Sequence, residues 1–354
     1  MGVGYRDRVT GGVLYRITVA IAAGALLAGC GQTASAPPQT SDESAAPVAM
    51  GLPGAKSSGA HGKLATASSP DWMGALPDDR PLGRLSVPGT HDTMAVHGGK
   101  GGPAVVTQEG FDKGCADEPC TSRQTLRGQL EAGVRALDIR VRRDEADVPA
   151  VQHGSFYQHA NLGDVLGVVD DFLSRHPRET VLLRVKAECA NDGRPFGCVD
   201  AGGAKPDLPL IDRYLTAAPR AWRPSATAHA DLPRLGDVRG KIVVTQFTDI
   251  EHGEDRGLTV DAQDLWDGPD MDVKWAAIAA HLAKAAAAPT PALYINYLSA
   301  NGAPDPTKFP GRYASYENDH TLDHLRTHPG PTGVLMMDFP GPALVEEIIR
   351  HNAG

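Results

Sequence analysis

Strands that are apolar along almost their whole length, separated by helical segments, constrain the fold of this chain more than any other feature. The apolar runs are RLSVPG, ALDIRVRR, VPAVQHG, TVLLRVKAE, KIVVTQF, ALYINYLS and TGVLMMDF, all beyond residue 81. Strands buried on both faces are typical of a parallel sheet covered by helices. Six or seven such strands in about 270 residues favour an α/β fold, an irregular TIM-type β/α barrel, over an open doubly wound sheet.

Helical patterns lie between these runs. The strongest is NLGDVLGVVDDFLSRHP, whose apolar residues at 162, 165, 166, 169, 172 and 173 have the spacing of one buried helix face. Asn161 is its expected N-cap. Further helices are expected near 124–132, 273–288 and 342–352, with a weak one around Leu210. Residues 189–235 are rich in Pro, Ala and Asp, so the barrel is expected to be irregular there.

The first thirty residues have the pattern of an export signal. Three arginines precede the apolar run ITVAIAAGALLAG, which is short for a membrane-spanning helix. The run ends in LAGC, which resembles the lipobox of bacterial lipoprotein precursors, so Cys30 is the expected lipidation site. A plain secretory signal with a chance cysteine is the alternative. We therefore expect an exported protein, either anchored on the outer face of the cell membrane or secreted.

Three segments follow from this pattern: a signal peptide over 1–30, a tether over 31–80, and the barrel over 81–354. The tether is rich in Ala, Ser, Pro and Gly and has few large apolar residues. Such a segment buries too little apolar surface to offset the entropy lost on ordering, so it is expected to be flexible.

Four cysteines remain for the barrel: Cys115, Cys120, Cys189 and Cys198. An even number of cysteines in an exported protein favours disulfides, and the short spacings favour Cys115–Cys120 and Cys189–Cys198 among the three pairings. A zinc site is the alternative, although no histidine lies at ligand spacing beside either pair.

The charge of the chain limits its partners. The net charge is −9, and no run of Lys or Arg occurs. This argues against nucleic acid as a partner, and it gives no electrostatic attraction to an anionic lipid surface. We expect a monomer.

Polar residues follow or end five of the apolar runs. His91 follows LSVPGT, His153 ends VPAVQH and Asp338 ends VLMMD. The others are Asp138 and Arg140 in LDIRVRR, and Lys186 and Glu188 in LLRVKAE. The carboxyl ends of barrel strands converge on one mouth, so these side chains are expected to face one cleft. Two histidines oriented by carboxylates can take and give protons, and an arginine suits phosphate, so the set predicts phosphodiester cleavage.

Several of these segments together resemble a known family. The segments are LSVPGTHDT, QLEAGVRALDIRVRR, VQHGSFYQHANLGDVLGVVDDFLSRHPRETVLLRVKAE, GKIVVTQF and GVLMMDFPG. They resemble the X-domain of bacterial phosphatidylinositol-specific phospholipase C, in the family's order, over about residues 81–351. The resemblance implies an irregular TIM barrel that acts at a membrane surface. It also implies cleavage of phosphatidylinositol, or a related inositol phospholipid, to diacylglycerol and inositol 1,2-cyclic phosphate.

The resemblance also implies roles for the strand-end residues. His91 would be the general base that removes the proton from the inositol 2-hydroxyl, with Asp338 as its carboxylate partner. His153 would be the general acid that protonates the leaving diacylglycerol oxygen, with Asp92 as its partner. Arg140 would stabilise the charge on the phosphate.

The arginine also bears on the cofactor. Calcium-dependent relatives place carboxylate ligands around the phosphate, and Arg140 stands at the matching position with a fixed charge that would replace the metal. Asp138 is expected to hold this arginine. We therefore expect no metal cofactor, with a weak calcium site at Asp138 and Glu188 as the less favoured alternative.

The resemblance also implies four residues that bind the head group: Lys186, Glu188, Asp264 and Trp266. The ring of Trp266 falls where an aromatic side chain of the family packs against the inositol. The family also has an inositol-binding arginine at the end of the strand that matches KIVVTQF, where this chain has Gln246 or Phe247. The head group therefore stays open between phosphatidylinositol, a mannosylated derivative and a glycosylated anchor.

Two other functions remain as alternatives. A metal-dependent glycerophosphodiester phosphodiesterase can use a similar barrel, but that chemistry needs a carboxylate cluster for a divalent metal. A non-catalytic surface lipoprotein that binds inositol lipids is favoured only if the histidines do not converge.

Overall fold

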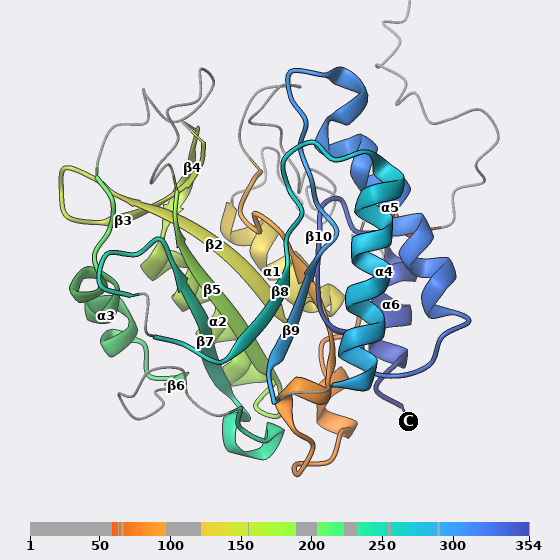
Figure 1. Cartoon of the computed structure of the whole chain (residues 1–354). Coiled ribbons are helices and arrows are strands. Elements are labelled where there is room, and N and C mark those ends of the chain that lie inside the picture. The colour runs from red at the N-terminus through yellow and green to blue at the C-terminus, as the bar shows by residue number, and fades with distance from the viewer. Residues whose placement is uncertain are drawn as a thin grey trace, which may run out of the picture. The chain divides into compact units, whose positions relative to one another are not determined.

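The structure is a computed structural model that describes most of the chain beyond residue 58 (Figure 1). The described residues are 59–62, 64, 67–96, 122–154, 156–188, 204–222, 232–253, 256–288 and 291–353. The predicted signal peptide, Cys30 and the four barrel cysteines lie outside them. None of the helices in these ranges is long and apolar enough to cross a membrane.

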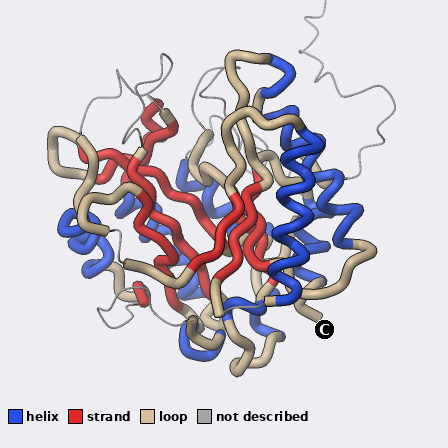
Figure 2. Tube along the Cα trace, in the orientation of Figure 1, coloured by secondary structure: helices blue, strands red, loops and turns tan. Residues whose placement is uncertain are grey.

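Ten strands form one sheet at the centre of the described part, with the helices around it (Figure 2). The strands are β1 (Ser86–Thr90), β2 (Ala136–Arg143), β3 (Pro149–His153), β4 (Phe156–Asn161), β5 (Thr180–Ala187), β6 (Ala221–Trp222), β7 (Lys241–Thr248), β8 (Val260–Gln263), β9 (Leu293–Tyr297) and β10 (Gly333–Met337). Their order is β6-β7-β5-β2-β1-β10-β9-β8, and every neighbouring pair on this path is parallel.

The sheet curls into an irregular barrel, as the sequence predicts. β1 pairs with β10 over its whole length, from Ser86↔Gly333 to Thr90↔Met337, which joins the two ends of the barrel sequence. The seam lies between β7 and β8, where Gln246 and Gly257 form an isolated bridge. Gly89 of β1 faces a narrow interior, since a Cβ there would lie 2.6 Å from Met336 Sδ.

One predicted strand runs the other way. VPAVQHG is expected among the parallel strands, but β3 is antiparallel to β2 and forms a hairpin with β4. The reason is the short connection after β2: a crossover to a parallel neighbour needs a dozen or more residues, and only 144–148 separate β2 from β3. His153 therefore reaches the mouth from a returning strand.

Six α-helices accompany the strands: α1 (Ser122–Ala132), α2 (Leu162–Arg175), α3 (Leu208–Ala217), α4 (Met271–Ala287), α5 (Pro310–Leu325) and α6 (Pro342–Arg350). The helix predicted after Asn161 is confirmed, with a capping box in which Asn161 and Asp164 exchange side-chain to backbone bonds. α5, β4, β6 and β8 are not among the elements predicted from the sequence. α5 carries buried polar residues such as Glu317 and Asn318, which obscure its apolar face.

Most buried apolar side chains belong to two large clusters on the two faces of the strands. Leu137 and Ile139 of β2 belong to the cluster that packs against the helices, whereas Ala136 belongs to the cluster inside the barrel. The same alternation occurs in β5, with Leu183 outward and Leu182 inward. The next inward positions along β2 and β5 are charged, so the barrel interior changes from apolar to polar toward the carboxyl ends.

The tether predicted for 31–80 is too long at its carboxyl end. Leu64 is fully buried in the outer cluster, and Met73, in a short 3-10 helix (Trp72–Ala75), is fully buried in the inner one. The carbonyl oxygen of Pro70 also accepts a hydrogen bond from Arg135. A few well-placed apolar residues and backbone acceptors therefore hold residues that composition alone assigns to a flexible segment.

Candidate active site

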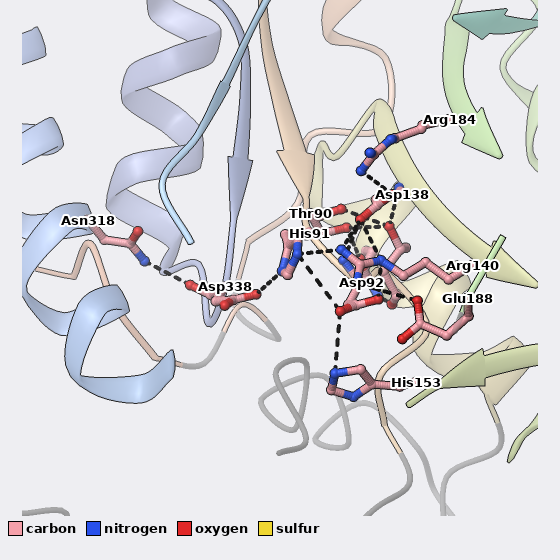
Figure 3. A network of polar contacts seen from close by, with 12 residues as sticks. Thr90, His91, Asp92, Asp138, Arg140, His153, Arg184, Glu188, Asn318 and Asp338 are labelled. Atoms are coloured by element: carbon pink, nitrogen blue, oxygen red, sulfur yellow. Dashed lines mark hydrogen bonds and ion pairs between the residues drawn. The ribbon is translucent and has the colours of Figure 1, made fainter. Parts of the chain in front are cut away.

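The strand-end residues meet at the carboxyl mouth of the barrel (Figure 3). Six of the predicted residues lie in one polar network: His91, Asp92, Asp138, Arg140, His153 and Asp338. All six are at most 9% exposed. They come from β2, from β3 and from the segments just after β1 and β10. His91 and Asp338, 247 positions apart in the chain, are therefore hydrogen-bond partners.

His91 has the tautomer of a general base. Arg140 Nη2 lies 2.6 Å from His91 Nε2, and because a guanidinium only donates, Nε2 must be the unprotonated nitrogen. Nδ1 then carries the proton and donates to Asp338 Oδ1 at 3.0 Å. Burial, followed by the charge of Arg140, lowers the pKa of His91 well below its ordinary value. The imidazole is therefore neutral and able to accept a proton on Nε2.

Asp338 is suited to stabilise that proton transfer. Its backbone oxygen accepts from Asn318 Nδ2 at 3.0 Å, which fixes the segment after β10. Burial, followed by the charge of Asp92, raises the pKa of the Asp338 carboxyl. A basic carboxylate is a strong acceptor for the Nδ1 proton and stabilises the imidazolium that forms when Nε2 is protonated.

Arg140 lies at the centre of the network. Its Nε is 2.7 Å from Asp92 Oδ1, and its Nε and Nη2 donate to Asp138 Oδ2 at 3.1 and 3.0 Å. Burial would raise the pKa of Asp138, but Arg140 and Arg184 outweigh it and hold that pKa well below its ordinary value. Asp138 is therefore ionised and keeps the guanidinium in place.

Asp92 connects the two histidines. Its Oδ2 lies 3.4 Å from His153 Nε2 and 3.8 Å from His91 Nε2. The residue has a left-handed backbone, φ 44°, and its N–H donates to Asp138 Oδ2 at 3.2 Å. Burial raises the pKa of Asp92 to about 6, against the opposing charge of Arg140. His153 Nδ1 is buried and has no hydrogen-bond partner within the described ranges, so its hydrogen-bonding capacity is unused in this structure.

This arrangement can perform acid–base chemistry on two sides of one anionic group. A neutral histidine and a second histidine lie within 3.8 Å of Asp92 Oδ2, and the guanidinium of Arg140 contacts Oδ1 of the same carboxylate. One histidine can remove a proton from a nucleophile, the other can protonate a leaving group, and the guanidinium can stabilise the negative charge.

Comparison with known proteins agrees with this geometry. Residues 118–198 match the family model for the phosphatidylinositol-specific phospholipase C X domain. The chain is 30% identical to the 1-phosphatidylinositol phosphodiesterase of Listeria monocytogenes over 304 residues, which are 81% of this chain and 86% of that protein. It belongs to the bacterial phosphatidylinositol-specific phospholipase C family.

Further relatives support the same assignment. The Staphylococcus aureus 1-phosphatidylinositol phosphodiesterase is 24% identical, over 83% of this chain and 97% of its own length. The solved structure of the Listeria phospholipase C superposes with a TM-score of 0.57 at 28% identity, and covers 80% of this chain and 99% of its own. A Staphylococcus phospholipase C structure superposes with a TM-score of 0.60 at 23% identity, which supports the fold.

The predicted head-group residues lie around this network to different degrees. The Trp266 ring packs against His91, with ring centroids 5.0 Å apart. Lys186 is paired in register with Arg140, and the charge of Arg140, followed by burial, lowers its pKa. Asp264 is exposed, just after β8.

Glu188 holds the site together. Its Oε1 accepts from the Gly154 N–H at 2.8 Å, and its Oε2 lies 3.6 Å from Arg140 Nη1. Because Gly154 follows His153, Glu188 ties the hairpin with the second histidine to the end of β5. This contact gives Glu188 a positioning role in addition to the predicted head-group contact.

Arg184 is a further residue of the network, one that is not among the predicted site residues. This residue is 7% exposed, and it donates through Nη1 to Asp138 Oδ1 at 3.2 Å and through Nε to Thr248 Oγ1 at 3.0 Å. Its guanidinium lies over the ring of Tyr297, 5.3 Å from the centroid. The two-residue period of β5 was the available signal, because Arg184 lies two residues before Lys186 and shares its face.

Arg184 also bears on the missing arginine of β7. Phe247 is buried in the outer apolar cluster, and Gln246 is the register partner of Arg184 on the neighbouring strand. A guanidinium therefore stands one strand away from the position where the family resemblance predicts one.

The carboxylates of the site are engaged with cations and backbone. Asp138 binds Arg140 and Arg184, and Glu188 binds Gly154. Among the described residues, no group of three or more His, Cys, Asp or Glu side chains is placed to hold a metal ion.

Proposed function

We propose that this chain is a phosphatidylinositol-specific phospholipase C that cleaves phosphatidylinositol to diacylglycerol and inositol 1,2-cyclic phosphate. One observation carries the proposal: His91, held as the Nε2-unprotonated tautomer, and His153 approach the same oxygen of Asp92, whose other carboxylate oxygen contacts Arg140. The names of the relatives in Listeria and Staphylococcus point to the same reaction.

In the first half of the reaction, His91 Nε2 takes the proton of the inositol 2-hydroxyl. The freed oxygen attacks phosphorus and forms the new P–O bond of the cyclic phosphate. Asp338 stabilises the imidazolium through the Nδ1 hydrogen bond. Since Arg140 Nη2 donates to Nε2 in this structure, the substrate hydroxyl replaces that contact and the guanidinium turns to the phosphate oxygens.

In the second half, the bond between phosphorus and the diacylglycerol oxygen breaks. His153 donates a proton to that oxygen through Nδ1, while Asp92 orients the ring through Nε2. Diacylglycerol leaves with this proton, and His91 retains the proton of the 2-hydroxyl. The two histidines return to their starting states by proton exchange with water.

The head group is held by the donors beside this network. Lys186 and Arg184 on β5 supply cations for hydroxyl oxygens, and Trp266 supplies an aromatic surface next to His91. Arg184 takes the place of the arginine that is absent from β7.

Phosphorus NMR tests the proposal most directly. With phosphatidylinositol as substrate, we expect the signal of a cyclic phosphate to appear. It should appear at the same rate with and without excess chelator. Loss of activity in chelator, restored by a divalent metal, would contradict the proposal in favour of a metal-dependent phosphodiesterase. Release of no product from any inositol phospholipid, with His91→Ala binding lipid as well as the wild type, would favour a binding protein.

The export features are proposals of the same kind, outside the described residues. We propose that Cys30 is lipidated and that Cys115–Cys120 and Cys189–Cys198 are disulfides. Cys30→Ser should then move the protein from the membrane fraction to the medium. Peptide mapping without reduction should recover both cystine-linked peptides.

A further inference from the structure

Residues 59–62 lie across the connection from β10 to α6, which begins with Asp338. An antiparallel bridge between His61 and Pro340 and three backbone hydrogen bonds join these residues to the connection and to the first turn of α6. Composition assigns the same four residues to the flexible tether. We call residues 59–62 the strap.

The strap caps the amino end of α6. The N-cap residue of this helix is Gly341, which has no side chain to accept a hydrogen bond from the first turn. Instead, the Ala60 carbonyl accepts from the Gly341 N–H at 2.8 Å, and the Gly59 carbonyl accepts from the Ala343 N–H at 3.0 Å. The first N–H groups of a helix need acceptors from outside the helix. The start of α6 therefore depends on the strap.

The contact leaves no room for a side chain on Gly341. A Cβ on this residue would lie 2.7 Å from the Ala60 carbonyl carbon, and closer still to the Gly59 carbonyl oxygen. The backbone of Gly341 is extended, with φ −102° and ψ 158°, which other residues adopt as readily. Glycine is therefore needed at position 341 because the strap packs against it.

The strap is itself held by the barrel. Ala60 is fully buried, and Leu64, two residues beyond the strap, is fully buried in the outer cluster. The His61 ring packs against the Phe339 ring, with centroids 5.7 Å apart. Buried apolar side chains therefore fix the strap against the connection.

The strap and α5 hold the segment of Asp338 from two sides. Asn318 Nδ2 of α5 donates to the Asp338 backbone oxygen at 3.0 Å (Figure 3). The Gly62 N–H of the strap donates to the next carbonyl, that of Phe339, at 3.0 Å. The Asp338 side chain accepts from His91 Nδ1, so the strap contacts the neighbour of the residue that orients this histidine.

We propose that the strap is a positioning element for the general base. It fixes the connection after β10 so that the Asp338 carboxylate stays at hydrogen-bond distance from His91 Nδ1. This inference rests on the proposed function in taking His91 as the base. Misplacement of a catalytic group by about 1 Å can cost about 10²-fold in rate. A segment with the composition of a linker therefore contributes to catalysis through the carboxylate.

Substitutions on the two sides of the contact test this role. Gly341→Ala places a Cβ where the strap lies. Gly62→Pro removes the N–H that bonds to Phe339, and proline cannot adopt the φ of 116° at this position. Gly62 is half-buried at the edge of the fold, so Gly62→Pro should fold even if Gly341→Ala does not.

The kinetic effect should fall on kcat. On dibutyroyl phosphatidylinositol, a soluble monomeric substrate, each variant should lower kcat about 10- to 100-fold with KM within about twofold. Both substitutions release the same contact, so the double variant should be no slower than the slower single variant. Gly167→Ala is the control, because this glycine is exposed on α2 and a Cβ there meets nothing within 4 Å. It should keep the kcat of the wild type.

Two measurements follow the strap and the histidine without any chemical step. Amide hydrogen exchange at residues 341 and 343, whose N–H groups donate to the strap, should become faster in both variants and stay unchanged in the control. The proton NMR signal of His91 Nδ1 lies far downfield while this proton is bonded to Asp338, and it should weaken or move upfield in both variants. If the wild type cleaves no inositol phospholipid, the proposed function fails, and these two measurements still decide whether the strap positions the histidine.

Three results would overturn the inference. The first is faster exchange with unchanged kcat and an unchanged Nδ1 signal, which would make the strap a cap for α6 alone. The second is unchanged exchange in Gly341→Ala, which would show that the strap does not pack against the connection. The third is a double variant in which the two losses of kcat multiply, because the substitutions would then act through separate contacts.

Discussion

Two buried arginines, Arg135 and Arg140, lie five positions apart and have opposite surroundings. Arg135 precedes β2 at the amino end of the barrel, and Arg140 lies at the carboxyl mouth on the same strand. Both are at most 9% exposed, and both contact carboxylates. Burial and ion pairing therefore do not distinguish them.

Arg135 is saturated by fixed acceptors. Its Nε donates to Glu179 Oε2 at 2.9 Å, and its other nitrogens donate to four backbone carbonyls, including those of Leu130 and Pro70. Its guanidinium also lies over the Phe172 ring, 4.5 Å from the centroid. These partners belong to the backbone or are buried, so the hydrogen bonds of Arg135 join α1, the start of β2 and the segment before β1.

Arg140 is surrounded by groups that can change their protonation state. It touches His91 and three carboxylates. The neighbouring atoms His153 Nδ1 and Asp338 Oδ2 have no hydrogen-bond partner among the described residues, and Asp92 Oδ2 has only its ion-pair contacts with the two histidines. Unused hydrogen-bonding capacity beside titratable groups is what a site needs to accept a substrate, so we expect Arg140 to act on a substrate and Arg135 to stabilise the fold.

The largest expected effect is on catalysis at the mouth. Arg140→Lys keeps the charge but loses the planar fork that reaches two phosphate oxygens. We expect kcat/KM on dibutyroyl phosphatidylinositol to fall about 10³-fold. Because lysine keeps a cation beside Asp92 and Asp138, the free energy of unfolding should fall by less than it does in Arg135→Lys. Steady-state kinetics and urea denaturation measure the two quantities. A large loss of stability with unchanged kcat/KM would show that Arg140 is structural.

The matched substitution at the other end should have the reverse effect. Arg135→Lys leaves several of the carbonyl acceptors and part of Glu179 without a donor in a fully buried site. We expect the free energy of unfolding to fall by about 3 kcal/mol. The kcat/KM per folded molecule should stay within about twofold of the wild type. A loss of kcat/KM similar to that of Arg140→Lys, at unchanged stability, would end the distinction between the two residues.

The same contrast explains what the sequence could and could not predict. The inward positions of β2 and β5 repeat every two residues, so the period places Asp138, Arg140 and Lys186 on one surface. The apolar runs also predict the barrel and six of its parallel strands correctly, with VPAVQHG as the exception. These features are local, and local patterns are visible in one sequence.

Features that depend on distant partners were harder to predict. VPAVQHG has the composition of a parallel strand, and only the five residues before it indicate a hairpin. Leu64 and Met73 lie in a segment of low apolar content and are buried because the barrel provides a surface for them. Only the two-residue period of β5 indicates that Arg184 faces the site. Its partners there, Asp138 and Tyr297, lie on other strands.

A smaller effect should appear in the pH dependence of stability. The pKa of Asp92 is about 6 in the folded chain and near the ordinary value of 3.8 in the unfolded chain. The folded state therefore binds a proton that the unfolded state has lost, and this stabilisation disappears as the pH rises from about 4 to 6. Asp92→Asn cannot ionise, and asparagine tolerates the positive φ at this position.

We expect the free energy of unfolding of Asp92→Asn, relative to that of the wild type, to rise by about 2 to 3 kcal/mol as the pH increases from 4 to 7. Its kcat/KM should fall sharply, because the ionised partner of His153 is lost. Urea denaturation at pH 4 and pH 7 gives the free energy of unfolding of both proteins. The contributions of the other titrating groups cancel when the two proteins are compared at the same pH. Equal pH dependence of the two proteins would mean that Asp92 has an ordinary pKa and a structural role.

The smallest effect concerns Lys274, a buried cation beside the mouth that combines features of the two arginines. Like Arg135, it is fully buried and bonded to a backbone carbonyl, that of Leu265. Like Arg140, it acts on the site, because that bond holds the segment that places Trp266 against His91. Lys274 is therefore a positioning residue for the aromatic wall.

Lys274→Met keeps the aliphatic stem and removes the hydrogen bond to Leu265, so Trp266 should become less well fixed. We expect KM for dibutyroyl phosphatidylinositol to rise about three- to tenfold with kcat within about twofold, because the wall contributes to binding in the ground state and the transition state alike. Lys284→Met, on the exposed face of the same helix, is the control and should leave both values unchanged. A fall in kcat at constant KM in Lys274→Met would instead place the lysine with Arg140, among the groups that act on the reacting phosphate.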